Sequence, residues 1–136
     1  MAPETVTLRT RPDLGRLRAR LRELVPDANA FDLTRALTVA SELGRNCLEH
    51  GGGGRCELEL RAGPGPGLGA VPGVRTLRLR FVDAGPGIAD LDAALAGGRS
   101  TRGGLGLGLG GSRRLADDFR IESTPAGTCV TVALRC

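Results

Sequence analysis

Residues 77–88 read Leu77-Arg78-Leu79-Arg80-Phe81-Val82-Asp83-Ala84-Gly85-Pro86-Gly87-Ile88, and this stretch decides which kind of fold we expect. Its first half alternates apolar and arginine side chains, which is typical of a β-strand with one face on the core and the other in water. The same period places Asp83 on the apolar face. Because an ionised carboxylate is costly to bury without a partner, the sequence predicts a polar partner for Asp83.

Other segments alternate in the same way and extend the argument to a whole sheet. They are residues 55–62, 119–124 and 128–134, and a shorter strand is expected around Val6 and Leu8. Since each long strand has one apolar and one polar face, helices should cover one side of the sheet only. We therefore predict a two-layer α/β sandwich, and we exclude a doubly wound parallel sheet, whose strands would be apolar on both faces. Thr128 is the polar member of the core-facing set in the last strand.

Two helices are predicted in the first part of the chain. One starts at Pro12-Asp13 and ends at Pro26, and the other runs from about Asp32 to the glycines at 51–54. The second helix carries a polar stripe next to its apolar stripe, which indicates a cleft at the edge of the core. The stripe consists of Glu42, Asn46, Glu49 and His50.

The remaining segments are rich in glycine. Residues 63–73 are expected to form a long connection between two strands, and residues 90–96 a short helix. Residues 97–111 contain too much glycine for a stable resting conformation and are predicted to form a lid. Ser112 is expected to cap a helix that continues to about Asp118.

Composition excludes several functions. The 136 residues suit one domain, which we take as residues 1–136. All 19 basic residues are arginine, which excludes P-loop NTPases, ordinary lysine-dependent protein kinases and Schiff-base enzymes. The single histidine excludes a paired-histidine zinc site. Few aromatic residues argue against nucleic acid binding, and the lack of a long apolar run or a secretory signal predicts a cytoplasmic protein with no membrane association.

Three segments, taken together, resemble a known superfamily. They are Glu42-Leu43-Gly44-Arg45-Asn46, Asp83-Ala84-Gly85-Pro86-Gly87-Ile88 and Gly104-Leu105-Gly106-Leu107-Gly108, and Gly127-Thr128 follows them. In this order and spacing they resemble the motifs of the GHKL ATPases, which include gyrase, Hsp90, MutL and the catalytic domains of histidine kinases. The resemblance implies the Bergerat fold, with a mixed, largely antiparallel sheet, and it implies ATP and Mg²⁺ as cofactors.

The resemblance also implies a role for each motif. Asn46 would bind Mg²⁺ through its side-chain carbonyl, which suits a hard cation. Asp83 would accept a hydrogen bond from the adenine amino group, supported by Thr128, while Gly85, Gly87 and Ile88 lie against the base and sugar. The lid would contact the phosphates through backbone amides and arginine side chains. Its residues are Arg99, Ser100, Thr101, Arg102, Gly104, Leu105, Gly106, Leu107 and Gly108.

The short lid, and the run from Gly98 through Ser112 to Ser123, narrow the resemblance to the RsbT-type serine/threonine switch kinases of bacterial partner-switching stress responses. The resemblance implies that such a kinase phosphorylates a STAS-domain antagonist, with Glu42 as the base, and activates a PP2C-type phosphatase once released. An anti-sigma factor kinase of the RsbW or SpoIIAB type, which sequesters a sigma factor, is the nearest alternative.

Two further alternatives come from other classes. One is a nucleotide-binding module without catalysis, although Glu42 and Asn46 are both present. The other is a dinucleotide-binding oxidoreductase, because Gly106, Gly108 and Gly111 match the glycine spacing of that motif. The context contradicts the second alternative, since no strand immediately precedes these glycines and the chain ends soon after them. We expect His50 to be structural rather than catalytic.

Overall fold

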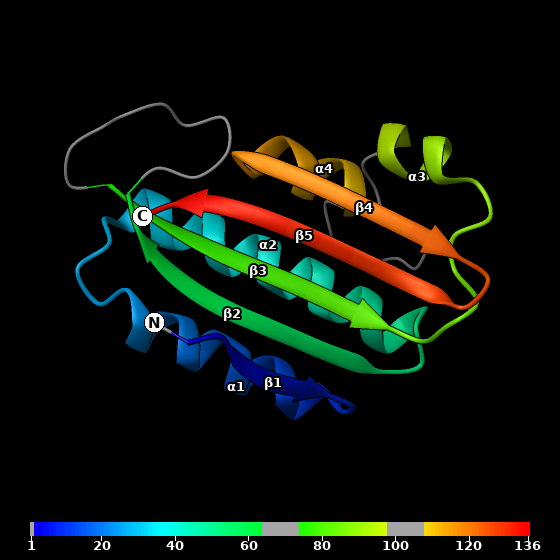
Figure 1. Ribbon diagram of the computed structural model, residues 1–136, viewed down its shortest axis with the longest axis horizontal. Helices are drawn as coiled ribbons and strands as arrows, with labels where there is room; N and C mark the ends of the chain where they lie inside the picture. The colour runs from blue at the N-terminus through cyan, green and yellow to red at the C-terminus, as the bar shows by residue number, and fades with distance from the viewer. Residues whose placement is uncertain (1, 64–73, 98–107) are drawn as a thin grey trace.

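The computed structural model describes residues 2–63, 74–97 and 108–136. Within them, five strands form one sheet in the order β1-β2-β3-β5-β4 (Figure 1). All four strand pairings are antiparallel, so the described sheet is antiparallel throughout rather than mixed. The strands are β1 (Glu4–Leu8), β2 (Gly54–Ala62), β3 (Arg75–Asp83), β4 (Asp118–Thr124) and β5 (Gly127–Arg135).

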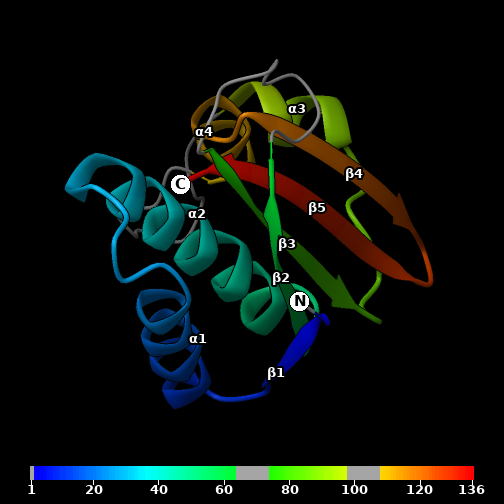
Figure 2. The same cartoon turned by 60° about the vertical axis from the view of Figure 1, so that its left-hand side comes forward.

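Four helices accompany the sheet: α1 (Arg11–Leu24), α2 (Ala30–Glu49), α3 (Leu91–Gly97) and α4 (Gly108–Leu115). Figure 2 shows α1 and α2 together on one side of the sheet. Between them and the strands lies one core, in which Leu43 of α2 and Leu79 and Phe81 of β3 are almost fully buried. The predicted two-layer sandwich, with helices on one face, is confirmed. None of the helices in the described ranges has both the length and the apolar character that crossing a membrane requires.

Local sequence signals place the ends of the long helices. Asn29 caps α2 because its Oδ1 accepts a hydrogen bond from Asp32 N at 2.8 Å. Asp13 closes the start of α1, where its Oδ2 accepts from Arg9 N at 2.8 Å and from Thr10 N at 2.9 Å. α1 ends at Leu24, just before Pro26, which cannot continue a helix.

The prediction for Ser112 is wrong. α4 begins at Gly108, inside the segment that we expected to form the lid, so Ser112 lies within the helix and is fully buried. Helix propensity places the start of α4 too late in the chain, because the glycines at 108, 110 and 111 disfavour a helix. Packing of α4 on α2 overrides that preference. The rest of the expected lid, residues 98–107, and most of the 63–73 connection lie outside the described residues.

Candidate functional site

A cavity of about 500 Å³ opens where α2, the ends of β3 and β5, α3 and the start of α4 meet. Asn46 and His50 of α2 line it, as do Asp83 of β3 and Thr128 of β5. Gly87, Ile88 and Gly108 also contribute to its wall. The structure therefore brings together residues from all three sequence motifs and from the final strand.

Asp83 lies on the core-facing side of β3, as its position in the alternation predicts, and it has the polar partners that burial requires. Its Oδ1 accepts hydrogen bonds from Gly85 N at 2.9 Å and Thr128 N at 3.2 Å. Thr128 is its direct cross-strand neighbour on β5. Within the described residues no donor bonds to Oδ2, so the carboxylate of this cavity residue is held through one oxygen.

Gly51, which our sequence analysis did not select, makes room for this carboxylate. A Cβ atom on Gly51 would lie only 2.6 Å from Asp83 Oδ2, closer than real Cβ contacts allow. Gly85 is packed on the same turn, since its own Cβ would lie 2.7 Å from Gly51 Cα. A glycine after the last turn of α2 could be predicted as a helix stop, but its closeness to Asp83 depends on how α2 crosses β3.

Gly87 and Ile88 are fixed by the neighbouring strand β4. Gly87 has a φ of +81°, and a Cβ there would overlap the carbonyl oxygen of Thr124, so only glycine fits. The hydroxyl of Ser123 accepts a hydrogen bond from Ile88 N at 2.8 Å and lies 3.0 Å from Thr128 Oγ1. Ser123 therefore connects the glycine turn after β3 to Thr128, a role that its alternating position in a strand could not reveal.

The polar stripe on α2 divides into two parts. Asn46 and His50 line the cavity, whereas Glu42, one turn before Asn46, lies beside it with a side chain that is 11% exposed. Oε1 of Glu42 accepts from Arg45 Nη1 at 2.9 Å, and Oε2 accepts from the backbone N of Gly108 at 3.4 Å. The carboxylate is thus directed to the first residue of α4.

Cys47 also lines the cavity, between Asn46 and the core. Burial, with a smaller contribution from the nearby Asp83 carboxylate, raises the pKa of this thiol to about 12. All four cysteines are free, and Cys47 and Cys56 are fully buried while Cys129 and Cys136 are half-buried. At neutral pH Cys47 is therefore a neutral, apolar part of the cavity wall.

Of the residues predicted to contact phosphates, only Gly108 is placed. Residues 99–102 and 104–107 lie outside the described residues, so the predictions for Arg99, Ser100, Thr101, Arg102, Gly104, Leu105, Gly106 and Leu107 stay predictions. Gly108 lines the cavity as the first residue of α4. Backbone N–H groups at a helix start attract anions, so this end of the cavity suits a negatively charged group.

Comparison with protein families agrees with this geometry. Residues 31–136, which include all of α2 except Ala30 and every cavity residue, match the histidine kinase-, DNA gyrase B- and HSP90-like ATPase family. The chain belongs to this ATPase family. The predicted GHKL resemblance is thereby confirmed, and membership in an ATPase family implies that the chain binds ATP.

One protein of similar sequence and one solved structure of similar fold can be compared with this chain. It is 38% identical over 92 residues to the serine/threonine-protein kinase RsbT of Bacillus subtilis, a match that covers 68% of the chain and 63% of RsbT. The structure is also similar to the crystal structure of the RsbU and RsbW domains of Rv1364c from Mycobacterium tuberculosis, with a TM-score of 0.64 at 21% identity. The superposition covers all of the present chain and 33% of the Rv1364c chain. The first match supports the RsbT-type resemblance, and the second confirms the fold.

Proposed function

We propose that this ATPase is a serine/threonine protein kinase that uses ATP and Mg²⁺ to phosphorylate a STAS-domain antagonist in a partner-switching pathway. We further propose that the kinase activates a PP2C-type phosphatase when the antagonist releases it. The 38% identity to a serine/threonine kinase supports the reaction class. The observation that carries the proposal is the fixed Asp83 carboxylate in the same cavity as Asn46, with one oxygen that no donor of the described ranges bonds.

The residues present fit an adenine nucleotide. The free Oδ2 of Asp83 is an acceptor, which suits the exocyclic amino group of adenine, and Thr128 beside it adds a hydroxyl. Cys47, Phe81 and Ile88 supply apolar surface for a base. A volume of about 500 Å³ lies within the usual range for small-molecule sites.

The donor set also fits Mg²⁺. Within the described ranges, no three His, Cys, Asp or Glu side chains gather as a metal site. Mg²⁺ bound with nucleotide usually takes few protein ligands and keeps several waters, so the carbonyl oxygen of Asn46 is a sufficient protein contribution. Bound ATP and Mg²⁺ would supply the phosphoryl group and offset its charge.

Glu42 is the residue we assign to the protein substrate. Its carboxylate would orient the serine or threonine hydroxyl and accept its proton as the oxygen bonds to phosphorus and ADP leaves. Among the described residues, Oε2 has only the 3.4 Å contact with Gly108 N, so a hydroxyl can replace that contact, while Arg45 continues to hold Oε1. Asp83 and Asn46 would position the nucleotide and do not change protonation.

A phosphotransfer assay tests this proposal. The chain is incubated with Mg²⁺, radiolabelled ATP and purified STAS-domain proteins, and label on serine or threonine is measured. Glu42→Gln should lower the transfer rate by about 10²- to 10⁴-fold, the usual contribution of a general base, with nucleotide affinity changed less than about threefold. Asn46→Ala should weaken Mg²⁺-dependent nucleotide binding.

Glu49→Gln is the matched control, because Glu49 belongs to the same polar stripe but, in the part of the chain that the structure describes, lacks the contact with Gly108 that Glu42 makes. It should leave transfer unchanged. Transfer by Glu42→Gln at the wild-type rate would show that Glu42 is not the base. If the wild-type chain binds ATP but labels no STAS protein, the kinase proposal fails and an inert nucleotide-binding module is favoured.

Affinity capture separates the switch kinase from the anti-sigma alternative. Recovery of a STAS protein together with a PP2C-type phosphatase would support the switch kinase. Recovery of an RNA polymerase sigma factor in the presence of ATP or ADP would favour the anti-sigma factor instead.

A further inference from the structure

α4 is a helix that its own sequence does not explain. It spans only Gly108–Leu115, and three of its eight residues are glycine. Helices this short are marginal in water, and each internal glycine costs about 1 kcal/mol relative to alanine. Yet α4 is helical, buries Leu109 and Ser112, and presents Gly108 to the cavity. Contacts from the rest of the molecule must therefore hold it.

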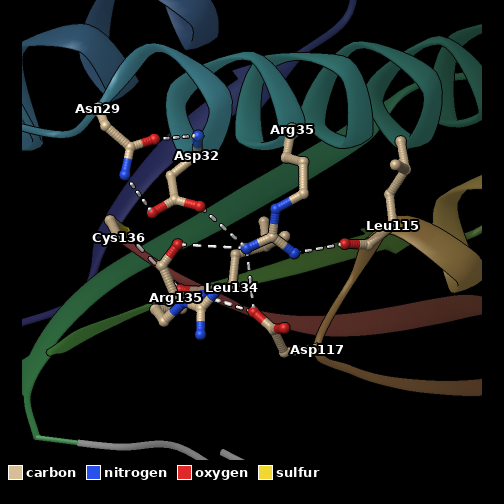
Figure 3. A network of polar contacts seen from close by, with 8 residues as sticks. All are labelled: Asn29, Asp32, Arg35, Leu115, Asp117, Leu134, Arg135 and Cys136. Atoms are coloured by element: carbon tan, nitrogen blue, oxygen red, sulfur yellow. Dashed lines mark hydrogen bonds and ion pairs between the residues drawn. The ribbon is translucent and has the colours of Figure 1, made fainter. Parts of the chain in front are cut away.

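Arg35 of α2 supplies such a contact at the carboxyl end of α4. Its Nη1 donates to the carbonyl oxygen of Leu115, the last residue of the helix, at 2.6 Å. Its Nη2 lies 3.2 Å from Asp117 Oδ2 and 3.5 Å from Asp32 Oδ1 (Figure 3). The Arg35 side chain is only 10% exposed. A cation that bonds a terminal carbonyl satisfies a backbone group that the helix leaves free and complements the helix dipole.

The other end of α4 meets an opposite charge from the same helix. Glu42 lies seven residues after Arg35 on α2, and it accepts from Gly108 N, seven residues before Leu115. Seven residues are about two turns of helix, roughly 10.5 Å, in both cases. α2 and α4 therefore run antiparallel, with the carboxylate at the positive end of α4 and the guanidinium at its negative end.

We propose that Arg35 is a positioning residue that keeps α4 helical and thereby holds the Gly108 amide at the cavity. Its part in nucleotide binding rests on the proposed function, whereas its effect on α4 does not. Arg35 is better suited to this role than Glu42, because a phosphate or a substrate hydroxyl at the cavity would compete for the amide that Glu42 contacts. Arg35 bonds the opposite end of α4, at Leu115, which does not line the cavity, so a bound phosphate or hydroxyl would not compete with it.

The two carboxylates that contact Arg35, those of Asp32 and Asp117, have other hydrogen-bond donors that remain when Arg35 is replaced. Asp117 Oδ2 also accepts from Arg135 N at 2.7 Å, and Asp32 Oδ2 is bonded by Asn29 Nδ2 at 3.1 Å. Both carboxylates thus keep a partner in Arg35→Met, whereas the carbonyl oxygens of Leu115 and Arg135 lose the hydrogen bonds at 2.6 and 3.5 Å that Arg35 donates. The variant is expected to fold, with the loss concentrated in α4.

Hydrogen exchange on the nucleotide-free protein tests the effect on α4. In Arg35→Met, peptides that cover residues 108–116 should exchange at least about tenfold faster than in the wild type, while β2, which Arg35 does not bond, changes less than about threefold. Arg35→Lys, which keeps the charge, should restore most of the protection. Arg20→Met is the matched control, because Arg20 bonds Glu4 across α1 and β1 without contacting α4, and it should leave α4 unchanged.

Measurements of nucleotide affinity and of the phosphotransfer rate then distinguish a positioning role of Arg35 from a catalytic one. The dissociation constant for Mg²⁺-ADP should rise about tenfold in Arg35→Met, and the phosphotransfer rate at saturating ATP should stay within about threefold. Unchanged exchange in α4, equal acceleration in β2, or no recovery in Arg35→Lys would overturn the proposal. A wild-type chain that binds no nucleotide would instead count against the proposed function, and the exchange result would still stand.

Discussion

At the scale of single residues, the site depends on one carboxylate and the space around it. The alternation of β3 correctly places Asp83 on the core side. Its two backbone donors come from Gly85 and from Thr128 on a different strand, so the bonding is visible only once β3 and β5 are paired. Gly51 approaches from the turn between α2 and β2, and its lack of a side chain is what lets the carboxylate occupy this position.

Gly51→Ala should therefore damage the site. The new methyl group must displace Asp83, so we expect at least about tenfold weaker nucleotide binding and a loss of about 1–3 kcal/mol in the free energy of unfolding, which is typical of overpacking. Calorimetric titration and urea unfolding measure the two effects.

Gly15→Ala is the control for this substitution. Gly15 lies on the exposed side of α1 with open space around it, so alanine should stabilise the chain by about 0.5–1 kcal/mol and leave binding unchanged. If Gly51→Ala behaves like Gly15→Ala, the packing argument for residue 51 is wrong.

At the scale of elements, helix ends show what local sequence can and cannot specify. The start of α1 is local, because Asp13 bonds the backbone of Arg9 and Thr10 only a few residues away. The start of α4 is not set by neighbouring residues, because the two ends of this helix, Gly108 and Leu115, bond to side chains of α2. The sequence therefore predicts the start of α1 correctly and misplaces the start of α4.

The start of α1 should be sensitive to acid. The backbone N–H groups of Arg9 and Thr10, together with Arg16, lower the pKa of Asp13 well below its ordinary value. A group whose pKa is lower in the folded state stabilises the fold above its unfolded pKa, about 3.9, and that contribution is lost as the pH falls below it. Asp13→Asn should lower Tm at pH 7, and its difference from the wild type should shrink as the pH falls from about 4 towards 2.

Glu23→Gln, near the other end of α1, is the comparison for this titration. Glu23 makes an exposed ion pair with Arg20, so its removal should change Tm little at any pH. A constant difference in Tm between Asp13→Asn and the wild type across this range would contradict the assigned role of Asp13.

At the scale of the whole molecule, the sheet separates two different surfaces. Its inner face is the apolar core beneath the helices, and its outer face carries ion pairs such as Arg80 with Glu57, at 3.1 Å. The cavity lies where the inner face meets α2, α3 and α4, so a ligand there contacts segments from most of the chain. Binding should therefore stabilise the whole fold.

Thermal unfolding measures this linkage. Mg²⁺-ADP at about 100 times its dissociation constant should raise the free energy of unfolding by about 2.7 kcal/mol. For a chain of this size, that corresponds to a rise of roughly 5–15 °C in Tm. Asp83→Asn should abolish the shift. Asparagine keeps the Oδ1 acceptor for Gly85 and Thr128 but offers an amide donor to the cavity, where the adenine amino group is also a donor. A full shift in Asp83→Asn would refute the proposed role of that carboxylate.

The sequence alone determined the layers, the long helices and strands and the face on which Asp83 and Thr128 lie, because periods of 2 and 3.6 residues are properties of adjacent positions. It also placed Glu42 and Asn46 on one side of α2. Only the tertiary structure decided the antiparallel strand order, the start of α4 at Gly108 and the parts played by Gly51, Ser123 and Arg35. Each of these depends on close contact between segments far apart in the chain, and no local pattern encodes such a distance.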